Sequence, residues 1–172
     1  MTWNLNNARQ VWSAIRAAGI DFAAMLPDSW MAEVERLILA DPEIMSVIVT
    51  REDEGVAVCA GAHLGGKKPC MIMEGSGIGL SAGVLTRPCI LQHIPVLILS
   101  SHVSGIGEPA YYHWETRYLL EPVLQALRIP YHVLWDIKDA ERVLKDAQMT
   151  VEGHTIPVAV LFPSSVIWEV RK

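Results

Sequence analysis

The sequence lacks a long apolar run. None of its segments approaches the roughly 20 consecutive apolar residues that a transmembrane helix needs. The N-terminal segment "MTWNLNNARQVW" also lacks the basic stretch followed by an apolar one that marks a secretory signal. We therefore expect a cytoplasmic protein that is not associated with a membrane.

Positive charge is scarce as well. The 14 lysine and arginine residues are outnumbered by 19 acidic ones, which gives a net charge of −5, and the basic residues are scattered along the chain. Surfaces that bind nucleic acid need a basic stripe that follows the phosphates. The composition therefore argues against nucleic acid as a partner.

Cysteine is rare and odd in number. Cys59, Cys70 and Cys89 are widely spaced within apolar or helix-like segments. This arrangement favours reduced, buried thiols over a disulfide framework or a zinc site. No histidine and carboxylate pair shows the spacing of metal ligands, so we assign no metal ligand in this chain.

The sequence is rich in material for a hydrophobic core. Of its 172 residues, 51% are hydrophobic, and we expect residues 1–172 to form one domain. Apolar runs typical of buried strands alternate with helical periodicity along the whole chain. The expected strands are 21–26, "IMSVIVT" (44–50), "CMIME" (70–74), "IPVLILS" (94–100), "YHVLW" (131–135) and "IPVAVLF" (156–162).

Helical segments separate these six strands. One is expected to begin after Pro27, capped by Asp28 or Ser29, and another to span residues 115–127. The alternation predicts a parallel sheet covered on both faces, which is a doubly wound, three-layer α/β fold. Ligands bind beyond the carboxyl ends of the strands in such sheets.

Three acidic residues, Glu52, Asp53 and Glu54, directly follow one predicted strand. The helix dipole alone favours acids in a first helical turn by about 0.3–1 kcal/mol each, so the cluster by itself indicates no function. The residues behind it, "GVAVCAGA", are mostly small, and each interior glycine costs a helix about 1 kcal/mol relative to alanine. We therefore expect a neighbouring helix or a flat ligand to approach this helix closely.

The turn "MEGSGIGL" follows a strand and opens a helix, as dinucleotide-binding turns do. The G-x-G-x-x-G fingerprint would need glycine in place of Leu80, and no Lys-Ser or Lys-Thr pair ends the turn as in a P-loop. Two interpretations stay open. The segment is either a tight strand-to-helix turn or a substrate-facing loop in which Ser76 and free amides bind an anion.

His102 and His113 lie in or beside the long loop after the fourth predicted strand. Loop histidines at the carboxyl end of a strand are candidates for substrate binding or proton transfer. A solvated or structural role is the alternative for both.

Taken in order, several segments resemble the pyrimidine-binding domain of thiamine diphosphate enzymes. The resemblance is to the α subunit of sulfopyruvate decarboxylase and the corresponding half of phosphonopyruvate decarboxylase in particular. It implies the thiamine diphosphate-binding fold and a carboxy-lyase that acts on a small 2-oxo acid. The segments are "LPDS", "TREDEGVAVCAGAHLGGKKP", "MIMEGSGIG", "IPVLILSSHVSGIGEP" and "LLEPVLQALRIPYHVL".

In that family a glutamate at the start of a helix is followed nine positions later by a glycine. Gly61 matches the glycine, which places Glu52 in the catalytic position and leaves Asp53 and Glu54 out of register. The resemblance implies that the Glu52 carboxyl group bonds N1′ of the cofactor's aminopyrimidine and favours its imino tautomer, which removes the thiazolium C2 proton. The implied cofactor-binding residues are Glu52, Pro27, Gly75 and Ser76, and the candidates for substrate binding are Asp28, Ser29, Ser76, His102 and His113.

The resemblance also implies a partner. These enzymes hold the diphosphate and its Mg²⁺ through a Gly-Asp-Gly motif and a later Asn on a second domain, and Gly-Asp-Gly does not occur here. We therefore expect the α subunit of a hetero-oligomer with at least two copies, completed by a diphosphate-binding β subunit of similar size. The small residues behind Glu52 would pack against that partner, with the cofactor between the two.

Two departures from the family bear on the substrate. The family tends to have "NSGLGN" where this chain has "GSGIGL", and its "HRG" or "WRG" is here "HVS", without an arginine to meet an anionic head group. Aromatic residues in "AYYHWE" lie nearby. A sulfopyruvate-like substrate and a less charged or aromatic 2-oxo acid both stay open. A carboligase subunit and a noncatalytic scaffolding subunit with the same fold are the alternatives.

Overall fold

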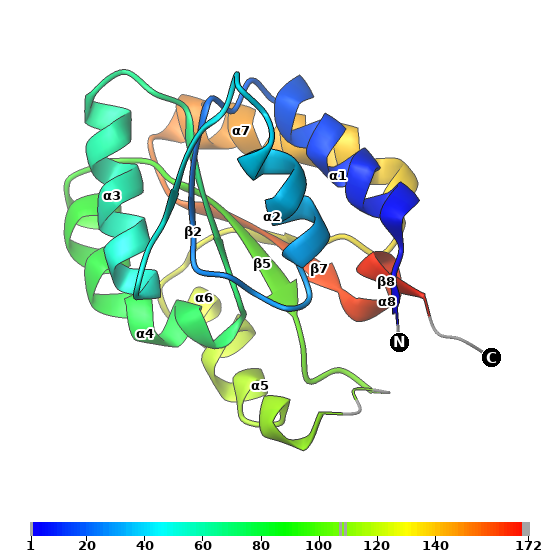
Figure 1. The fold of residues 1–172 in the computed structure, drawn as a ribbon. Coiled ribbons are helices and arrows are strands. Elements are labelled where there is room, and N and C mark those ends of the chain that lie inside the picture. The colour runs from blue at the N-terminus through cyan, green and yellow to red at the C-terminus, as the bar shows by residue number, and fades with distance from the viewer. Residues whose placement is uncertain (1, 107, 109, 170–172) are drawn as a thin grey trace.

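A six-stranded parallel sheet forms the centre of the computed structural model, which describes residues 2–106, 108 and 110–169 (Figure 1). All six strands predicted from the sequence are present, and the doubly wound α/β fold is confirmed. The strands are β2 (Phe22–Met25), β3 (Met45–Ile48), β4 (Pro69–Met73), β5 (Leu97–His102), β6 (Tyr131–Val133) and β7 (Val158–Pro163), in the spatial order β3-β2-β4-β5-β7-β6.

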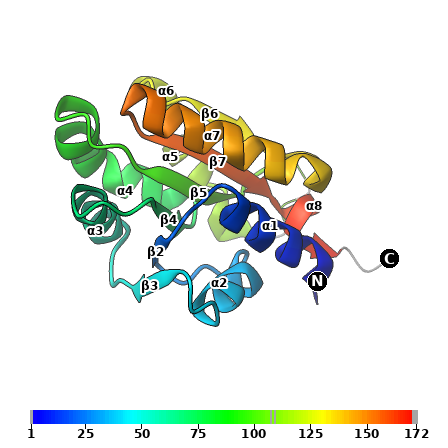
Figure 2. The ribbon, with the colours of Figure 1, turned by 90° about the horizontal axis from the view of Figure 1, so that it is seen from above.

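Helices cover both faces of the sheet (Figure 2). One face carries α1 (Leu5–Ala17), α2 (Ala32–Leu39) and α7 (Ala140–His154), and the other carries α3 (Glu52–Leu64), α4 (Ser76–Val84) and α6 (Glu121–Ala126). The chain leaves β2 towards the first face and β4 towards the second. These neighbouring strands therefore form a switch point at their carboxyl ends, where ligands bind in such sheets. No helix in the described ranges is long and apolar enough to span a bilayer.

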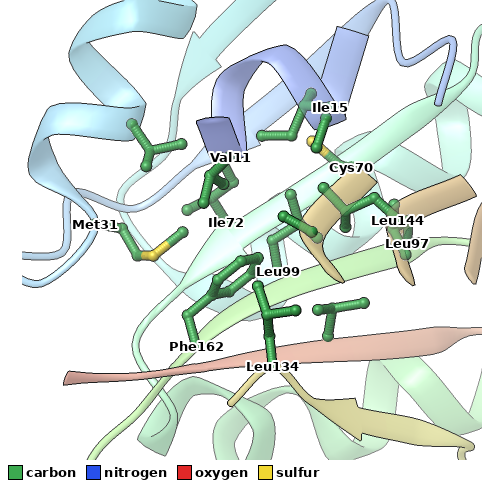
Figure 3. Packing of buried hydrophobic residues seen from close by; sticks show 14 of the residues in the cluster. Val11, Ile15, Met31, Cys70, Ile72, Leu97, Leu99, Leu134, Leu144 and Phe162 are labelled. Atoms are coloured by element: carbon green, nitrogen blue, oxygen red, sulfur yellow. The ribbon is translucent and has the colours of Figure 1, made fainter. Parts of the chain in front are cut away.

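Two hydrophobic clusters fill the space between the sheet and its two helix layers. Figure 3 shows the cluster under α1 and α7, where Ile15, Leu144 and Phe162 pack together. Ile72 of β4 belongs to this cluster, whereas its neighbour Met71 belongs to the other. Because successive side chains of a strand point to opposite faces, a strand buried on both sides needs an unbroken apolar sequence, as β4 has.

Several elements were not indicated by the sequence pattern. The N-terminal β1 (Thr2–Trp3) pairs antiparallel with β8 (Trp168–Glu169), beside the short α8 (Ser164–Ile167). A π-helical segment (Leu85–Leu91) follows α4.

The expectation of a single helix over 115–127 was wrong. Two helices occupy this region, α5 (Thr116–Leu119) and α6, with a break at Leu120, where ψ is −94°. Pro122 has no N–H to donate to a carbonyl of the preceding turn, and proline is well suited to the first turn of a helix. The first helix therefore ends, and α6 begins with Pro122 in its first turn.

Candidate functional site

Glu52 is the first residue of α3 and is half-buried at the carboxyl edge of the sheet. The other two acids of its cluster are engaged locally. Asp53 lies 2.9 Å from the guanidinium of Arg51, and Glu54 accepts a hydrogen bond from the amide of Thr50. Glu52 makes no hydrogen bond or ion pair with any described residue. It is therefore the one carboxylate of the three that is available to a ligand.

Gly77 of α4 lies directly against Glu52. A β-carbon at Gly77 would come within 2.5 Å of Glu52 Cγ and 2.8 Å of Met73 Sδ, closer than real β-carbons approach other atoms. The glycine therefore lets α4 close onto the glutamate side chain. Helices α3 and α4 lie side by side (Figure 1), and together they position the Glu52 side chain.

The small residues of α3 divide into two sets. Gly55 faces the chain's own sheet, where a β-carbon would lie 2.3 Å from Met71 Sδ. Gly61 has open space around it, since a β-carbon there would have no neighbouring atom within 4 Å. Ala57 and Leu64 on the same helix are exposed, Leu64 to 73%. The inward set thus serves packing within the chain, and the outward set forms a surface that the described residues leave uncovered.

A second group of polar side chains lies where β2, β4 and β5 end. Asp28 is only 5% exposed. Burial raises the pKa of Asp28 and nearby Glu74 adds to the rise, while the Ser101 hydroxyl and His113 oppose it. The buried Asp28 Oδ2 and Ser101 Oγ form no well-aligned hydrogen bond with any described residue, although the Ser101 hydroxyl is near enough to act on the pKa of Asp28. Such atoms are rare in folded proteins and commonly mark the place of a ligand or a bound water.

The expectation that Asp28 or Ser29 caps α2 was wrong. That helix begins only at Ala32, and Asp28 Oδ1 accepts instead from the amide of Trp30 at 3.0 Å. The amide of Asp28 donates to Glu35 Oε1, also at 3.0 Å. Glu35 is buried, and burial raises its pKa to about 7. These contacts hold Asp28 in a turn that leaves its second oxygen free.

The polar groups of Ser76 in the first turn of α4 are already bonded to another residue of the chain. Ser76 donates its amide to Glu74 Oε2 at 3.0 Å, and its hydroxyl bonds to the same oxygen. The Ser76 amide is thus not available to an external anion. Gly75 is buried, because a β-carbon there would lie 2.9 Å from Thr116 Cγ2 and 3.0 Å from Leu120 Cδ2. This explains glycine where the resemblance would place asparagine, since the position has no room for a side chain.

The two loop histidines lie in different surroundings. His113 is buried with its ring 5.7 Å from that of Trp30, and it is near enough to Asp28 to act on the pKa of that group. His102, at the end of β5, has its Nε2 2.8 Å from Glu121 Oε1. His113 therefore belongs to the Asp28 group, whereas His102 is paired with Glu121.

The structure thus brings some predicted site residues together. Asp28 and His113 are close, Ser76 shares α4 with Gly77 beside Glu52, and Pro27 and Ser29 flank Asp28 as exposed residues. No hydrogen bond or ion pair in the described part of the chain joins Glu52 to Asp28. The residues that sequence reasoning missed are Glu35, Glu74 and Ser101. Of these three, only Glu74 could have been noticed in the sequence, because it is an acid placed directly after a buried strand.

The arrangement of strands and helices is shared with two solved structures. The 2-oxoglutarate:ferredoxin oxidoreductase from Magnetococcus marinus matches with a TM-score of 0.76 and 20% identity, over 94% of this chain and 29% of that one. The thiamine diphosphate-dependent 4-hydroxybenzoylformate decarboxylase of Rhodococcus jostii matches with a TM-score of 0.67 and 18% identity, over 93% of this chain and 30% of that one. The fold is the thiamine diphosphate-binding fold in the form of its pyrimidine-binding domain, as expected.

Proteins related in sequence identify a family within this fold class. No protein-family model matches the chain. It is 31% identical over 165 residues to the sulfopyruvate decarboxylase subunit alpha of Methanococcus maripaludis, covering 96% of this chain and 98% of the relative. It is 28% identical over 169 residues to the sulfopyruvate decarboxylase of Methanosarcina acetivorans, covering 96% of this chain but 42% of the relative. The chain belongs to the family of sulfopyruvate decarboxylase alpha subunits, and its enzyme class is that of the carboxy-lyases.

Proposed function

We propose that the chain is the α subunit of a two-subunit, thiamine diphosphate-dependent decarboxylase of 2-oxo acids, in which Glu52 activates the cofactor. The observation that carries this proposal is the carboxylate of Glu52. It is half-buried, it has no partner among the described residues, and it lies against Gly77 at the carboxyl edge of the sheet.

The residues present fit the aminopyrimidine end of the cofactor. A free carboxyl group beside helices with small side chains can accept a flat ring and exchange a proton with a ring nitrogen. Thiamine diphosphate, when bound, supplies the carbon nucleophile for the keto carbon and takes up the electrons that carbon dioxide leaves behind. We assign Glu52, Pro27 and Ser76 to contact with the pyrimidine. Gly75 would act through its lack of a side chain, which lets α5 pack over the first turn of α4.

The substrate side of the proposal rests on the group around Asp28. Its free Oδ2 and its raised pKa make Asp28 a residue that can hold a proton and transfer it to a substrate. His113 lies near it and is the second candidate for proton transfer. Ser29, Ser76 and His102 are proposed to contact the 2-oxo acid.

In this proposal the chain supplies half of an active site. A β subunit of similar size would hold the diphosphate through Mg²⁺ and pack on the outward surface of α3 around Gly61. The match to less than half of the Methanosarcina acetivorans protein supports a second part of comparable size, because 42% of that relative is covered. We expect a cytoplasmic hetero-oligomer with at least two copies of this chain.

Reconstitution tests the proposal. Carbon dioxide release from 2-oxo acids is measured for three samples, with thiamine diphosphate and Mg²⁺ present. The samples are the chain alone, a candidate β subunit alone and the mixture of the two. The candidate β subunit is one that contains Gly-Asp-Gly and a later Asn. We expect carbon dioxide release only from the mixture of the two subunits. This release should be lost when the chain carries Glu52→Gln. Wild-type turnover in Glu52→Gln would contradict the role of Glu52. Product analysis with an acceptor aldehyde separates decarboxylation from carboligation, and an inactive mixture would favour the scaffolding alternative.

A further inference from the structure

Two tryptophans that are far apart in the sequence meet in the two-stranded ladder of β1 and β8 (Figure 1). Trp3 pairs with Trp168, and their ring centres lie 5.5 Å apart. Each strand of the ladder has only two residues. Because even a full two-stranded ribbon is marginally stable in water, such a short ladder adds little to the fold by itself. Its main consequence is the placement of the two indole rings.

Each of these indole rings donates a hydrogen bond to the turn that carries Asp28. Trp3 Nε1 donates to the Ser29 carbonyl at 2.9 Å. Trp168 Nε1 donates to the Trp30 carbonyl at 3.3 Å. The two carbonyls belong to the residues that directly follow Asp28 in the sequence. The Trp3–Trp168 pair therefore fixes the backbone of the turn immediately after Asp28.

Trp30 extends this contact to the second candidate for proton transfer. The Trp30 ring is buried, and its centre lies 4.7 Å from that of Trp168 and 5.7 Å from that of His113. Aromatic rings at such separations pack favourably. A row of three rings, Trp168, Trp30 and His113, therefore joins β8 to the group around Asp28.

The carboxyl group of Asp28 depends on this turn for its direction. Asp28 Oδ1 accepts from the Trp30 amide at 3.0 Å, whereas the buried Oδ2 forms no well-aligned hydrogen bond with any described residue. A group that transfers a proton must lie within hydrogen-bond reach of the reacting atom. Misplacement by about 1 Å can cost about 100-fold in rate, even when the cause is far from the chemistry. The turn thus decides where the free oxygen of Asp28 can act.

We propose that Trp3 and Trp168 are positioning residues, whose indole N–H groups hold the Asp28 carboxyl group in place for the reaction. This inference rests on the proposed function and deepens it, since it takes Asp28 as a residue that transfers a proton to the substrate. The two tryptophans act through the backbone of the turn. The β1–β8 ladder, which is not part of the six-stranded sheet, thereby contributes to the geometry of the site.

Removal of the two indole N–H groups in the assembled enzyme tests the proposal. Phenylalanine keeps a ring but has no donor, so a chain with both Trp3→Phe and Trp168→Phe should hold the turn less firmly. We expect this double variant to lose at least about tenfold in kcat, with a smaller change in KM. Trp12→Phe is the matched control and should keep kcat, because the Trp12 indole donates to Asp41 beyond the other end of α2, at 3.1 Å. Equal losses in the double variant and in Trp12→Phe would overturn the proposal.

A titration of the Asp28 carboxyl group in the full chain gives a second test that needs no activity. Burial raises the pKa of Asp28 and Glu74 adds to the rise, while the Ser101 hydroxyl and His113 oppose it. The carboxyl group of Glu35 also acts on Asp28. A looser turn would admit water, so the pKa of Asp28 should fall towards the ordinary range of an aspartate. The carbon-13 signal of the Asp28 carboxyl group, identified by its absence in Asp28→Asn, follows the titration in NMR spectra.

The titration separates this proposal from the decarboxylase function. We expect a lower pKa of Asp28 in the double variant, a smaller fall in Trp3→Phe alone, and the wild-type value in Trp12→Phe. The signal is that of the folded chain, so a variant that is merely less stable keeps the wild-type value. A lowered pKa together with a wild-type complex that releases no carbon dioxide would refute the decarboxylase and support the positioning of Asp28. An unchanged pKa in the double variant would overturn the positioning role of both tryptophans.

Discussion

The Glu52 side chain lies against the backbone of Gly77, so closely that a β-carbon at residue 77 would come within 2.5 Å of Glu52 Cγ. Gly77→Ala must therefore displace the glutamate or push α4 away from α3. In the proposed function Glu52 is the catalytic group, and misplacement of such a group by about 1 Å can cost about 100-fold in rate, so we expect a loss of that order. Carbon dioxide release by the complex of α and β subunits measures it.

Gly153→Ala is the control for this substitution. Gly153 is also helical, but a β-carbon there would have nothing within 4 Å, and α7 covers the other face of the sheet. The variant should fold and turn over as the wild type does. Equal turnover in the two alanine variants would show that Gly77 does not position Glu52.

The outward surface of α3 predicts where the partner binds. Gly61→Leu adds a side chain into open space, so the isolated chain should keep its stability. If the β subunit packs on this surface, the added side chain should weaken assembly by at least about tenfold, since overpacking costs about 1–3 kcal/mol. Gly153→Leu is the matched control on α7. Analytical ultracentrifugation of the mixed subunits gives both affinities, and equal values would place the interface elsewhere.

Glu35 predicts a pH dependence of folding stability. Burial raises the pKa of Glu35 from 4.5 to about 7, so between these values the folded chain keeps a proton that the unfolded chain releases. The stabilising contribution of this proton is complete below about pH 4.5 and is lost as the pH rises towards 7, up to about 3 kcal/mol in all.

Glu35→Gln tests this prediction, because it keeps an acceptor for the Asp28 amide but cannot titrate. The free energy of unfolding of the variant should therefore improve relative to that of the wild type between pH 4.5 and pH 8. Urea unfolding at both pH values measures the change. A difference that stays constant with pH would mean that Glu35 is not protonated in the folded chain.

The sequence predicted the layers of the fold well, because strands buried on both faces must be apolar throughout. The sequence of β4, "PCMIM", is apolar throughout and meets that requirement. The break at Leu120 and the pairing of Trp3 with Trp168 were harder to predict. The pairing joins the two ends of the chain, which no local pattern reports.

In the candidate site, too, features within one element could be predicted from the sequence, and contacts between elements could not. Glu52 could be predicted because the family resemblance matches Gly61 to a glycine nine positions after the catalytic glutamate, although nothing in the sequence shows that Gly77 lies against it. Glu35 appears in the sequence as an ordinary helical acid, and its burial arises only when the turn at Asp28 folds over it. Contacts between different elements are absent from local patterns, so the surroundings of Asp28 required the structure.

Exchange of the C2 proton of bound thiamine diphosphate with deuterium from the solvent tests the central claim most directly. In the assembled enzyme we expect fast exchange in the wild type and in Asp53→Asn, the matched substitution of the neighbouring acid. Exchange in Glu52→Gln should be slower by at least about 100-fold, the usual contribution of a positioned acid or base. If Glu52→Gln exchanged as fast as the wild type, Glu52 would not be the residue that activates the cofactor.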